Sequence, residues 1–483
     1  MNKLKSTYWE LSSSLINSLN INSIDYCHWK SNINVEEAMS GFDDLDLLVS
    51  RNDFNKCQII LSELDFKEAL NSIQNIHSVR HYYGFDQLTG EILHVHLYVS
   101  IITGPSWTKG YTFSIEQEYL SSSTLNDNLK IRLPQKEYEL ALFLIRICLK
   151  YSSLLEAPLV VFSRKSIATE IKYLFEGSSI DVTSEIFNRL IGSNNNNLFS
   201  NIVDANTSLI KIIITAFRVR LKLKRWRTLS KSKQINYSIL QLSYRFINKI
   251  LLKKKKKLAN GGLLISFVGL DASGKSTMLS EADRWLSKNF NVKKIHFGRP
   301  TSSLITLLPN LLIKLNKKLK GSKRISSSYN NRKKQSLIFV VRQVVLAYDR
   351  YKLVLKARNL SRKGYVVLID RFKSENIGKM DSHKLDPNKF DSFKKYLAKI
   401  ENDLYYKMGI PNLLLQLKIP IDVAVKRNNE RIKSDKESTP ELKLRYDINK
   451  NLVYKANNCY DIDSNKDYNE VLTQIKGLIW KSL

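Results

Sequence analysis

The stretch LLISFVGLDASGKSTMLSEADRWL, residues 263–286, decides the fold of the second half of this chain. It begins with the largely apolar run 263–268, which predicts a buried strand. Gly269, four further residues, Gly274, Lys275 and Ser276 come next, and residues 276–286 have the pattern of a helix. A strand that runs through a glycine-rich loop into a helix is an arrangement in which the backbone can hold phosphate groups.

The spacing of this loop is the Walker A pattern, and each residue type in it has a physical role. Because Gly269 and Gly274 lack side chains, the backbone can wrap around a phosphate and point its N–H groups at it. Lys275 supplies a mobile cation for the outer phosphates, and the Ser276 hydroxyl, helped by Thr277, can hold Mg2+. We therefore predict ATP and Mg2+ as cofactors. The predicted nucleotide-binding residues are Gly269, Ser273, Gly274, Lys275, Ser276 and Thr277.

Two further strands follow the loop in an informative order. GYVVLIDRF, residues 364–372, ends in Asp370-Arg371. An acid at the carboxyl end of a parallel strand beside such a loop is expected to bind Mg2+ or its water, and the adjacent arginine can clamp a phosphate. PNLLLQLKI, residues 411–419, leads into a helix on which Arg427 and Arg431 lie four apart. This basic segment is either a lid over the transferring phosphoryl group or an ordinary exposed charged helix.

Residues 262–450 resemble the thymidylate kinase family of nucleoside monophosphate kinases. The resemblance is carried by VGLDASGKST, IDRF and PNLLLQLKIPIDVAVKR. It implies an α/β domain with a parallel sheet flanked by helices. It also implies that Lys275 and Ser276 bind ATP and Mg2+, that Asp271 sits near the metal or acceptor phosphate, that Arg371 grips the acceptor, and that Arg427 and Arg431 belong to the lid.

The sequence departs from that family on the acceptor side. Val268 stands where a Glu usually precedes the loop, and HFGRPTSS replaces the acceptor-binding Arg-Glu-Pro-Gly motif, leaving Arg299 and Pro300 as equivalents. GKMDSHKL and IENDLYYKMGIPN are similar to segments of divergent members found in bacterial surface-polysaccharide gene clusters. The resemblance therefore implies a specialised phosphotransferase whose small-molecule acceptor is a nucleotide or a sugar.

The N-terminal part contains a second carboxylate motif, GFDDLDLLV at residues 41–49. On a strand Asp44 and Asp46 share one face, so they can hold Mg2+ ions for nucleotidyl transfer. The motif resembles the nucleotidyltransferase superfamily, with Lys30-Ser31 where Gly-Ser would stand. Capping of the start of a strand is the alternative role for Asp44 and Asp46.

The third acid of that superfamily is missing. The matching strand, EILHVHLYV, carries His94 and His96 on one face, and it forms a predicted hairpin around Gly90 with the preceding strand. Histidine can bind a metal, but in place of the third acid it lowers two-metal competence. The alternative is a half-buried hairpin face with satisfied imidazoles.

The chain of 483 residues is strongly basic, with a formal net charge of +32. Residues 205–260 contain 16 basic residues and no acidic one, which favours an acidic membrane surface as a peripheral partner, with nucleic acid ranked lower. The alternative interpretation of this excess is compositional drift in an AT-rich genome. Four cysteines without CxxC spacing, and no signal peptide or membrane span, predict a cytoplasmic protein. A homodimer is a further expectation.

We predict a nucleotidyltransferase-like α+β domain at 1–130, a helical region at 131–250, a basic linker at 251–262 and a P-loop kinase domain at 263–483. The main hypothesis is an ATP- and Mg2+-dependent phosphotransferase. The alternatives are a non-catalytic nucleotide-binding scaffold that docks on nucleic acid or membrane, and a nucleotidyltransferase acting in defence.

Overall fold

The computed structural model describes residues 9–72, 78–106, 108–153, 156–192, 196–204, 207–298, 336–430 and 438–483. The chain divides into two compact units, Met1–Lys254 and Lys255–Leu483. Within the described residues, no helix is both long and apolar enough to cross a membrane.

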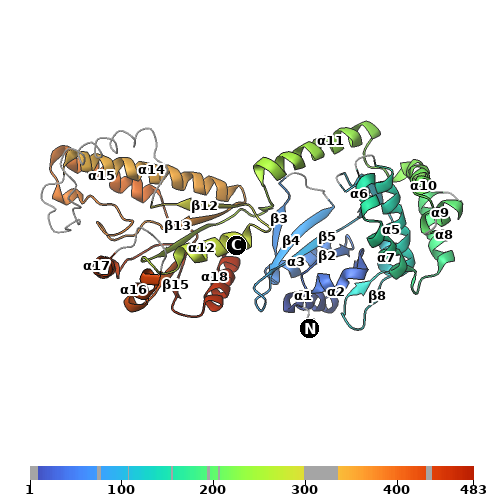
Figure 1. The fold of residues 1–483 in the computed structure, drawn as a ribbon, viewed down its shortest axis with the longest axis horizontal. Helices are drawn as coiled ribbons and strands as arrows, with labels where there is room; N and C mark the ends of the chain where they lie inside the picture. Colours follow the sequence, from blue (N-terminus) through green and yellow to red (C-terminus); the bar gives the residue numbers. More distant parts are fainter. Residues whose placement is uncertain are drawn as a thin grey trace. The chain divides into compact units, whose positions relative to one another are not determined.

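The C-terminal unit is built on a five-stranded sheet in the order β12-β13-β11-β14-β15 (Figure 1). Every neighbouring pair in it is parallel. The strands are β11 (Leu264–Gly269), β12 (Val292–His296), β13 (Val366–Asp370), β14 (Leu413–Lys418) and β15 (Asn458–Asp463). Central strands buried on both faces read as continuous apolar runs, which is why β11, β13 and β14 could be predicted from the sequence.

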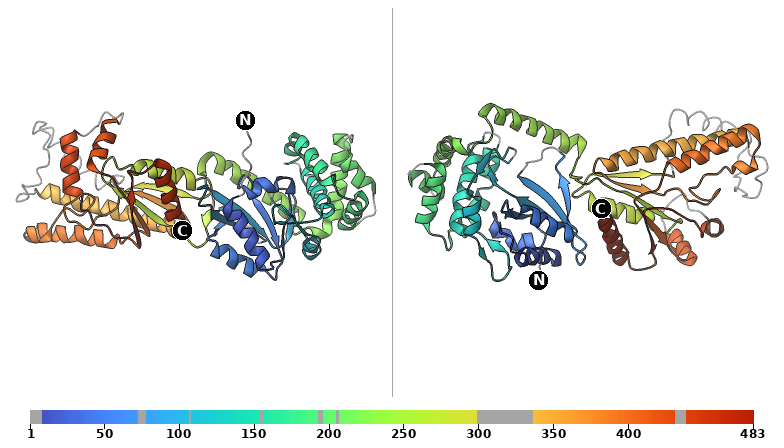
Figure 2. Two further views of the ribbon diagram at one scale, coloured as in Figure 1. Left: turned by 90° about the horizontal axis from the view of Figure 1, so that it is seen from below. Right: turned by 180° about the vertical axis from the view of Figure 1, so that it is seen from behind.

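Helices cover both faces of this sheet. The long helix α14 (Leu337–Arg362) and α15 (Ser392–Lys407) run side by side on one face, and α12 (Lys275–Leu286) and α18 (Tyr468–Ser482) pack on the other (Figures 1 and 2). Trp285 of α12 meets Trp480 of α18 edge to face, with ring centroids 6.2 Å apart. The described residues of this unit also form α16 (Ile421–Glu430) and α17 (Thr439–Asn449).

The strand register places the functional ends of the sheet at one edge. Phe267 of β11 pairs with Asp370, and Gly269 pairs with Leu417. The carboxyl ends of β11, β13 and β14 therefore lie together, where ligands bind in open parallel sheets.

The strands of the N-terminal unit form a mixed sheet in the order β1-β2-β5-β4-β3. β2 and β5 are parallel, and β4 and β5 form the hairpin predicted from the sequence. These strands are β1 (Tyr26–His28), β2 (Leu45–Val49), β3 (Lys67–Leu70), β4 (Val79–Phe85) and β5 (Ile92–Tyr98). Helices α1 (Glu10–Ile21), α2 (Val35–Met39) and α3 (Phe54–Glu63) share a core with one face of the sheet.

A helical part follows and shares a second core with the same sheet. Leu48 and Tyr98 of the sheet, and Trp29 just after β1, belong to the apolar cluster that includes most of the buried face of α5. Its helices are α4 (Glu116–Ser121), α5 (Lys136–Tyr151), α6 (Ala157–Phe162), α7 (Arg164–Phe175), α8 (Ile180–Ile191), α9 (Asn196–Val203), α10 (Leu209–Lys222) and α11 (Lys231–Ile247). The described residues also form short strands: β6 (Ile101–Thr103), β7 (Tyr111–Phe113), β8 (Thr124–Leu125), β9 (Arg132–Leu133) and β10 (Lys257–Leu258).

The end of the predicted basic linker packs into the C-terminal unit. The Leu258 N–H donates to the Gly364 carbonyl at 3.1 Å, and the Gly262 N–H donates to the Ser361 carbonyl at 2.8 Å. The Leu258 side chain is buried. The solvated part of the linker is therefore shorter than the sequence pattern indicates.

Candidate functional site

The predicted phosphate loop forms the turn between β11 and α12. Gly269 has a φ of +148° and Gly274 a φ of +86°, values that side-chain-bearing residues rarely adopt. A Cβ at Gly269 would lie 2.4 Å from the Leu417 carbonyl oxygen. Gly274 is the residue before α12, and Ser276 and Thr277 are exposed in the first turn of that helix. The N–H groups at this helix end point at the space in front of the loop, which suits an anion.

Lys275 is the first residue of α12, and its side chain turns back into the preceding phosphate loop. Its side chain is buried, and its ammonium group donates to the Leu270 carbonyl at 3.2 Å. Burial lowers the pKa of Lys275, and the positive charge of Arg371 adds to the effect. Asp271 partly offsets both. The ammonium group is thus held among the loop carbonyls, ready to exchange that contact for a phosphate oxygen.

Arg371 stands at the centre of an ion-pair network at the end of β13. Its guanidinium lies 3.0 Å from Asp271 Oδ1 and 3.4 Å from Asp381 Oδ2. Arg445 of α17 reaches the other Asp271 oxygen at 2.7 Å. Burial alone would raise the pKa of Asp271, but the two guanidinium groups outweigh it and lower that pKa below its usual value.

The backbone at Arg371 is unusual. Its φ is +71°, in the left-handed region, and its N–H donates to the Phe267 carbonyl at 2.9 Å. Such a conformation in a residue with a long side chain costs about 1–3 kcal/mol, and it occurs where the surrounding structure requires it. Here the turn directs the side chain from the end of β13 toward Asp271.

Two buried oxygens at this edge fit a bound metal–nucleotide complex. Among the residues that the structure describes, Asp370 Oδ1 and Ser273 Oγ are buried and have no hydrogen-bond partner. His296 lies 3.7 Å from the other Asp370 oxygen. Buried polar atoms normally find a partner, so these atoms suit a site that ligands complete.

A cavity of about 140 Å³ opens beside the loop. The residues lining it include Gly269, Ser273, Gln416, Tyr446, Asn449 and Tyr454. The Tyr446 hydroxyl donates to the Ile419 carbonyl at 2.6 Å, which fixes α17 against the segment after β14. The loop therefore adjoins enclosed space as well as the open edge of the sheet.

The predicted lid residues are only partly accounted for. Arg427 of α16 donates to the Ser464 carbonyl at 2.8 Å, just beyond β15. Arg431, Arg299 and Pro300 lie outside the described residues. The lid role of Arg427 and Arg431 stays a prediction.

Two residues at this site, Arg445 and Asp381, were not predicted from the sequence. Arg445 meets Asp271 across 174 residues of chain. Asp381 is buried and binds Arg371 from within the GKMDSHKL segment. A local signal existed only for Asp381, because its segment, GKMDSHKL, is similar to segments of divergent thymidylate kinase-like proteins.

In the N-terminal unit, Asp44 and Asp46 face the two histidines of β5, as the predicted alternation requires. His94 Nδ1 lies 2.6 Å from Asp44 Oδ1, and His96 Nδ1 lies 3.0 Å from Asp46 Oδ1. Lys30 reaches the second Asp46 oxygen at 2.8 Å. Burial would raise the pKa of Asp46, but the charge of Lys30 and the contact with His96 hold it well below its usual value.

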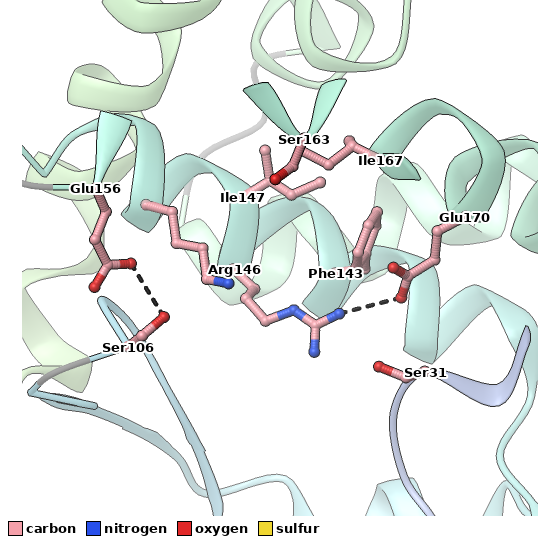
Figure 3. A pocket seen from close by; sticks show the side chains of 10 residues that line it. Ser31, Ser106, Phe143, Arg146, Ile147, Glu156, Ser163, Ile167 and Glu170 are labelled. Atoms are coloured by element: carbon pink, nitrogen blue, oxygen red, sulfur yellow. Dashed lines mark hydrogen bonds and ion pairs between the residues drawn. The ribbon is translucent and has the colours of Figure 1, made fainter. Parts of the chain in front are cut away.

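A cavity of about 350 Å³ lies near this motif, and Ser31 lines it (Figure 3). Ser31 has a left-handed backbone, with a φ of +58°. Arg146 of α5 points across the cavity to Glu170, 3.2 Å away, and Ser106 bonds to Glu156 at the same distance (Figure 3). The cavity wall therefore carries both charges: Arg146 is paired with Glu170, and Lys150 of α5 adds a second cation to the lining.

Comparisons with known proteins find relatives of part of this chain. No protein-family model matches the chain. Thymidylate kinase of Thermosipho melanesiensis is 25% identical over 227 residues, covering 45% of this chain and 97% of that protein. The uncharacterized ATP-binding protein YghR of Escherichia coli (strain K12) is 26% identical over 224 residues, covering 45% of this chain and 86% of that protein. Among solved structures, thymidylate kinase of Candida albicans is 22% identical, with a TM-score of 0.27, and covers 46% of this chain and 92% of that one.

Over about 45% of its length, then, the chain has a thymidylate kinase-like P-loop kinase fold. The predicted fold class, α/β with a parallel sheet flanked by helices and substantial helical structure besides, is confirmed. The nucleotidyltransferase-like nature of the N-terminal unit stays a prediction.

Proposed function

We propose that the C-terminal unit is an ATP- and Mg2+-dependent phosphotransferase of the nucleoside monophosphate kinase type. The observation that carries the proposal is the convergence of the phosphate loop, Asp370 and Arg371 at one edge of the sheet. Asp370 is the last residue of β13, directly beside the loop strand β11, and Arg371 follows it. A relative that is a thymidylate kinase and another that is an ATP-binding protein support the same reading.

Residues of the phosphate loop have distinct proposed roles in binding ATP, the phosphoryl donor. The N–H groups of the loop and of the first turn of α12 would bind the phosphates of ATP, with Lys275 on the outer ones. The hydroxyls of Ser276 and Thr277 would hold Mg2+ or its waters, together with Asp370 Oδ1, which has no hydrogen-bond partner among the described residues. Bound Mg2+ supplies charge neutralisation on the phosphates as the phosphoryl group moves.

The acceptor side depends on Arg371. A guanidinium binds a phosphate or carboxylate through two parallel hydrogen bonds, and here Asp271 and Asp381 hold it in place at the end of β13. In phosphoryl transfer most of the rate enhancement comes from positioning and charge stabilisation. We propose that Arg371 orients the acceptor and that Asp271 sets its direction.

The acceptor itself is proposed as a nucleotide or a sugar intermediate of surface-polysaccharide synthesis. Support comes from the departures in the acceptor region, since HFGRPTSS replaces the usual acceptor motif of thymidylate kinases. These departures leave the loop and the end of β13 intact. Donor chemistry is therefore kept while the acceptor pocket differs.

The test is a panel of nucleoside monophosphates, sugars and sugar phosphates incubated with labelled ATP and Mg2+. We expect one class of acceptor to be phosphorylated, and Lys275→Ala to lower the rate by about 10²- to 10³-fold, the loss of one charge-stabilising group. Lys293→Ala is the matched control, because Lys293 is an exposed lysine of β12 in the same unit. Transfer that is unchanged in Lys275→Ala would refute the proposal. ATP binding with no transfer to any acceptor would favour the scaffold.

A further inference from the structure

A cluster of three histidines lies next to the Asp44–Asp46 motif in the N-terminal unit. We propose that His81, His94 and His96 bind a transition-metal ion of the Zn2+ class, with Asp44 and Asp46 as supporting carboxylates. The ligand atoms of the three histidines lie within 4.8 Å of one another. The proposal is independent of the kinase function proposed above.

The sheet brings the three side chains to one face. His94 and His96 are two residues apart on β5, so they point the same way. His81 of β4 is the cross-strand partner of His96 in the antiparallel hairpin. Directly paired residues place their side chains on the same face, and the ring centroids of His81 and His96 are 4.6 Å apart.

The two aspartates decide which nitrogens face inward. Asp44 lies against Nδ1 of His94, and Asp46 lies against Nδ1 of His96. A carboxylate accepts hydrogen bonds, so each neutral imidazole must carry its proton on Nδ1 and keep its lone pair on Nε2. His94 Nε2 is in fact the atom that approaches His81, at 3.2 Å from its Nδ1.

This pattern of carboxylate, histidine and metal is the usual environment of a metal-binding imidazole, because the outer carboxylate fixes the ring and makes its nitrogen more basic. The spacing is suitable as well. Zn–N bonds of about 2.0–2.1 Å place tetrahedral ligands about 3.3–3.4 Å from each other. The 3.2 Å separation of His81 and His94 already matches this value. The ligand atoms of the three histidines all lie within 4.8 Å of one another, so modest side-chain rotations bring the other pairs to the same separation.

The chemistry of the donors selects the class of ion. Imidazole nitrogen suits Zn2+ and its transition-metal neighbours, whereas Mg2+ prefers oxygen ligands. The second oxygen of Asp46 is engaged by Lys30 at 2.8 Å, so an ion bound directly to it would have to displace an ammonium group. Three protein ligands leave a tetrahedral ion one position for water or a substrate oxygen.

The direct test is on the wild-type full-length protein, stripped of metal with a chelator and dialysed. Calorimetric titration with ZnCl2 should show one tight site per chain. X-ray absorption of the Zn-loaded protein should show nitrogen ligands at about 2.0–2.1 Å with the outer scattering of imidazole rings. A spectrum dominated by oxygen, or no tight site at all, would overturn the proposal without any variant.

Variants assign the ligands. His81→Ala and His96→Ala should each abolish the tight site, and Asp44→Asn should weaken it about 10- to 100-fold, as the loss of a supporting carboxylate does. His383→Ala, which removes a histidine of the C-terminal unit, is the matched control and should leave the titration unchanged. Zn2+ binding retained in both histidine variants would refute the site. So would displacement of Zn2+ by an equal concentration of Mg2+, which would indicate a carboxylate site instead.

Discussion

Gly269 and Gly274 bracket the phosphate loop, and an added methyl group should affect them differently. Both have positive φ, so alanine at either position is strained. At Gly274 nothing lies within 4 Å of the new Cβ, and the backbone strain of about 1–2 kcal/mol is the whole cost. At Gly269 the Cβ would lie 2.4 Å from the Leu417 carbonyl oxygen and 2.8 Å from Ser273 Oγ.

The larger cost at Gly269 follows from that contact. An ordinary approach of carbon to a carbonyl oxygen is about 3.3 Å, so the two strands must separate by about 0.9 Å. Leu417 belongs to the backbone of β14 and pairs with Gly269, so no side chain can simply rotate away. Overpacking of this kind costs about 1–3 kcal/mol, and the strained φ adds about 1–3 kcal/mol. We expect Gly269→Ala to destabilise the sheet edge by about 2–6 kcal/mol.

Hydrogen exchange measured by mass spectrometry on the full-length variants is the appropriate assay, because it reports the opening free energy of individual segments. Peptides covering β11 and α12 should exchange much faster in Gly269→Ala than in Gly274→Ala, while peptides from the N-terminal unit should be unchanged. Equal protection in the two variants, or a greater loss in Gly274→Ala, would show that the contact with Leu417 does not constrain the loop.

Three further predictions concern charge and packing. Arg445→Gln removes one of the two guanidinium groups that pair with Asp271, so it should raise the depressed pKa of Asp271. The stability that ionised Asp271 contributes should then be lost at a higher pH during acid unfolding. An unchanged pH midpoint of acid unfolding would contradict this. Burial raises the pKa of Glu139 from 4.5 to about 7. The free energy of unfolding should therefore fall by up to about 3 kcal/mol as the pH rises across that interval, and denaturant titrations of Glu139→Gln should lack this slope. Phe187→Ala should cost about 3–5 kcal/mol in denaturant unfolding, because the ring is fully buried in the helical core; a loss below about 1 kcal/mol would mean that the core closes over the gap.

Much of the C-terminal sheet could be predicted because its signals are local. A buried parallel strand needs an apolar run, and the loop needs glycine at two fixed positions. β13 and β14 lie within the predicted runs 364–372 and 411–419, and β11 ends one residue beyond the run 263–268. The hairpin of β4 and β5 was predicted for the same reason, from two apolar runs around Gly90.

The ion-pair network could not be predicted, because it depends on which distant elements pack together. Arg445 lies on α17, and nothing in its local sequence distinguishes it from the many other basic residues of this chain. Only the packing of α17 beside the loop brings it to Asp271. His81 is a similar case, since its place beside His96 depends on the register of β4 against β5.

The two carboxylate motifs show why a motif alone does not assign a metal ligand. Asp46 and Asp370 both lie in apolar strands, and the sequence predicted Mg2+ for each. Asp370 keeps one buried oxygen without a partner among the described residues, so an ion can bind there without breaking a hydrogen bond. Asp46 has its oxygens engaged by His96 and Lys30, and an ion bound directly to it must displace one of them. Breaking a buried charge pair costs several kcal/mol, which favours direct metal binding at Asp370 and a supporting role for Asp46.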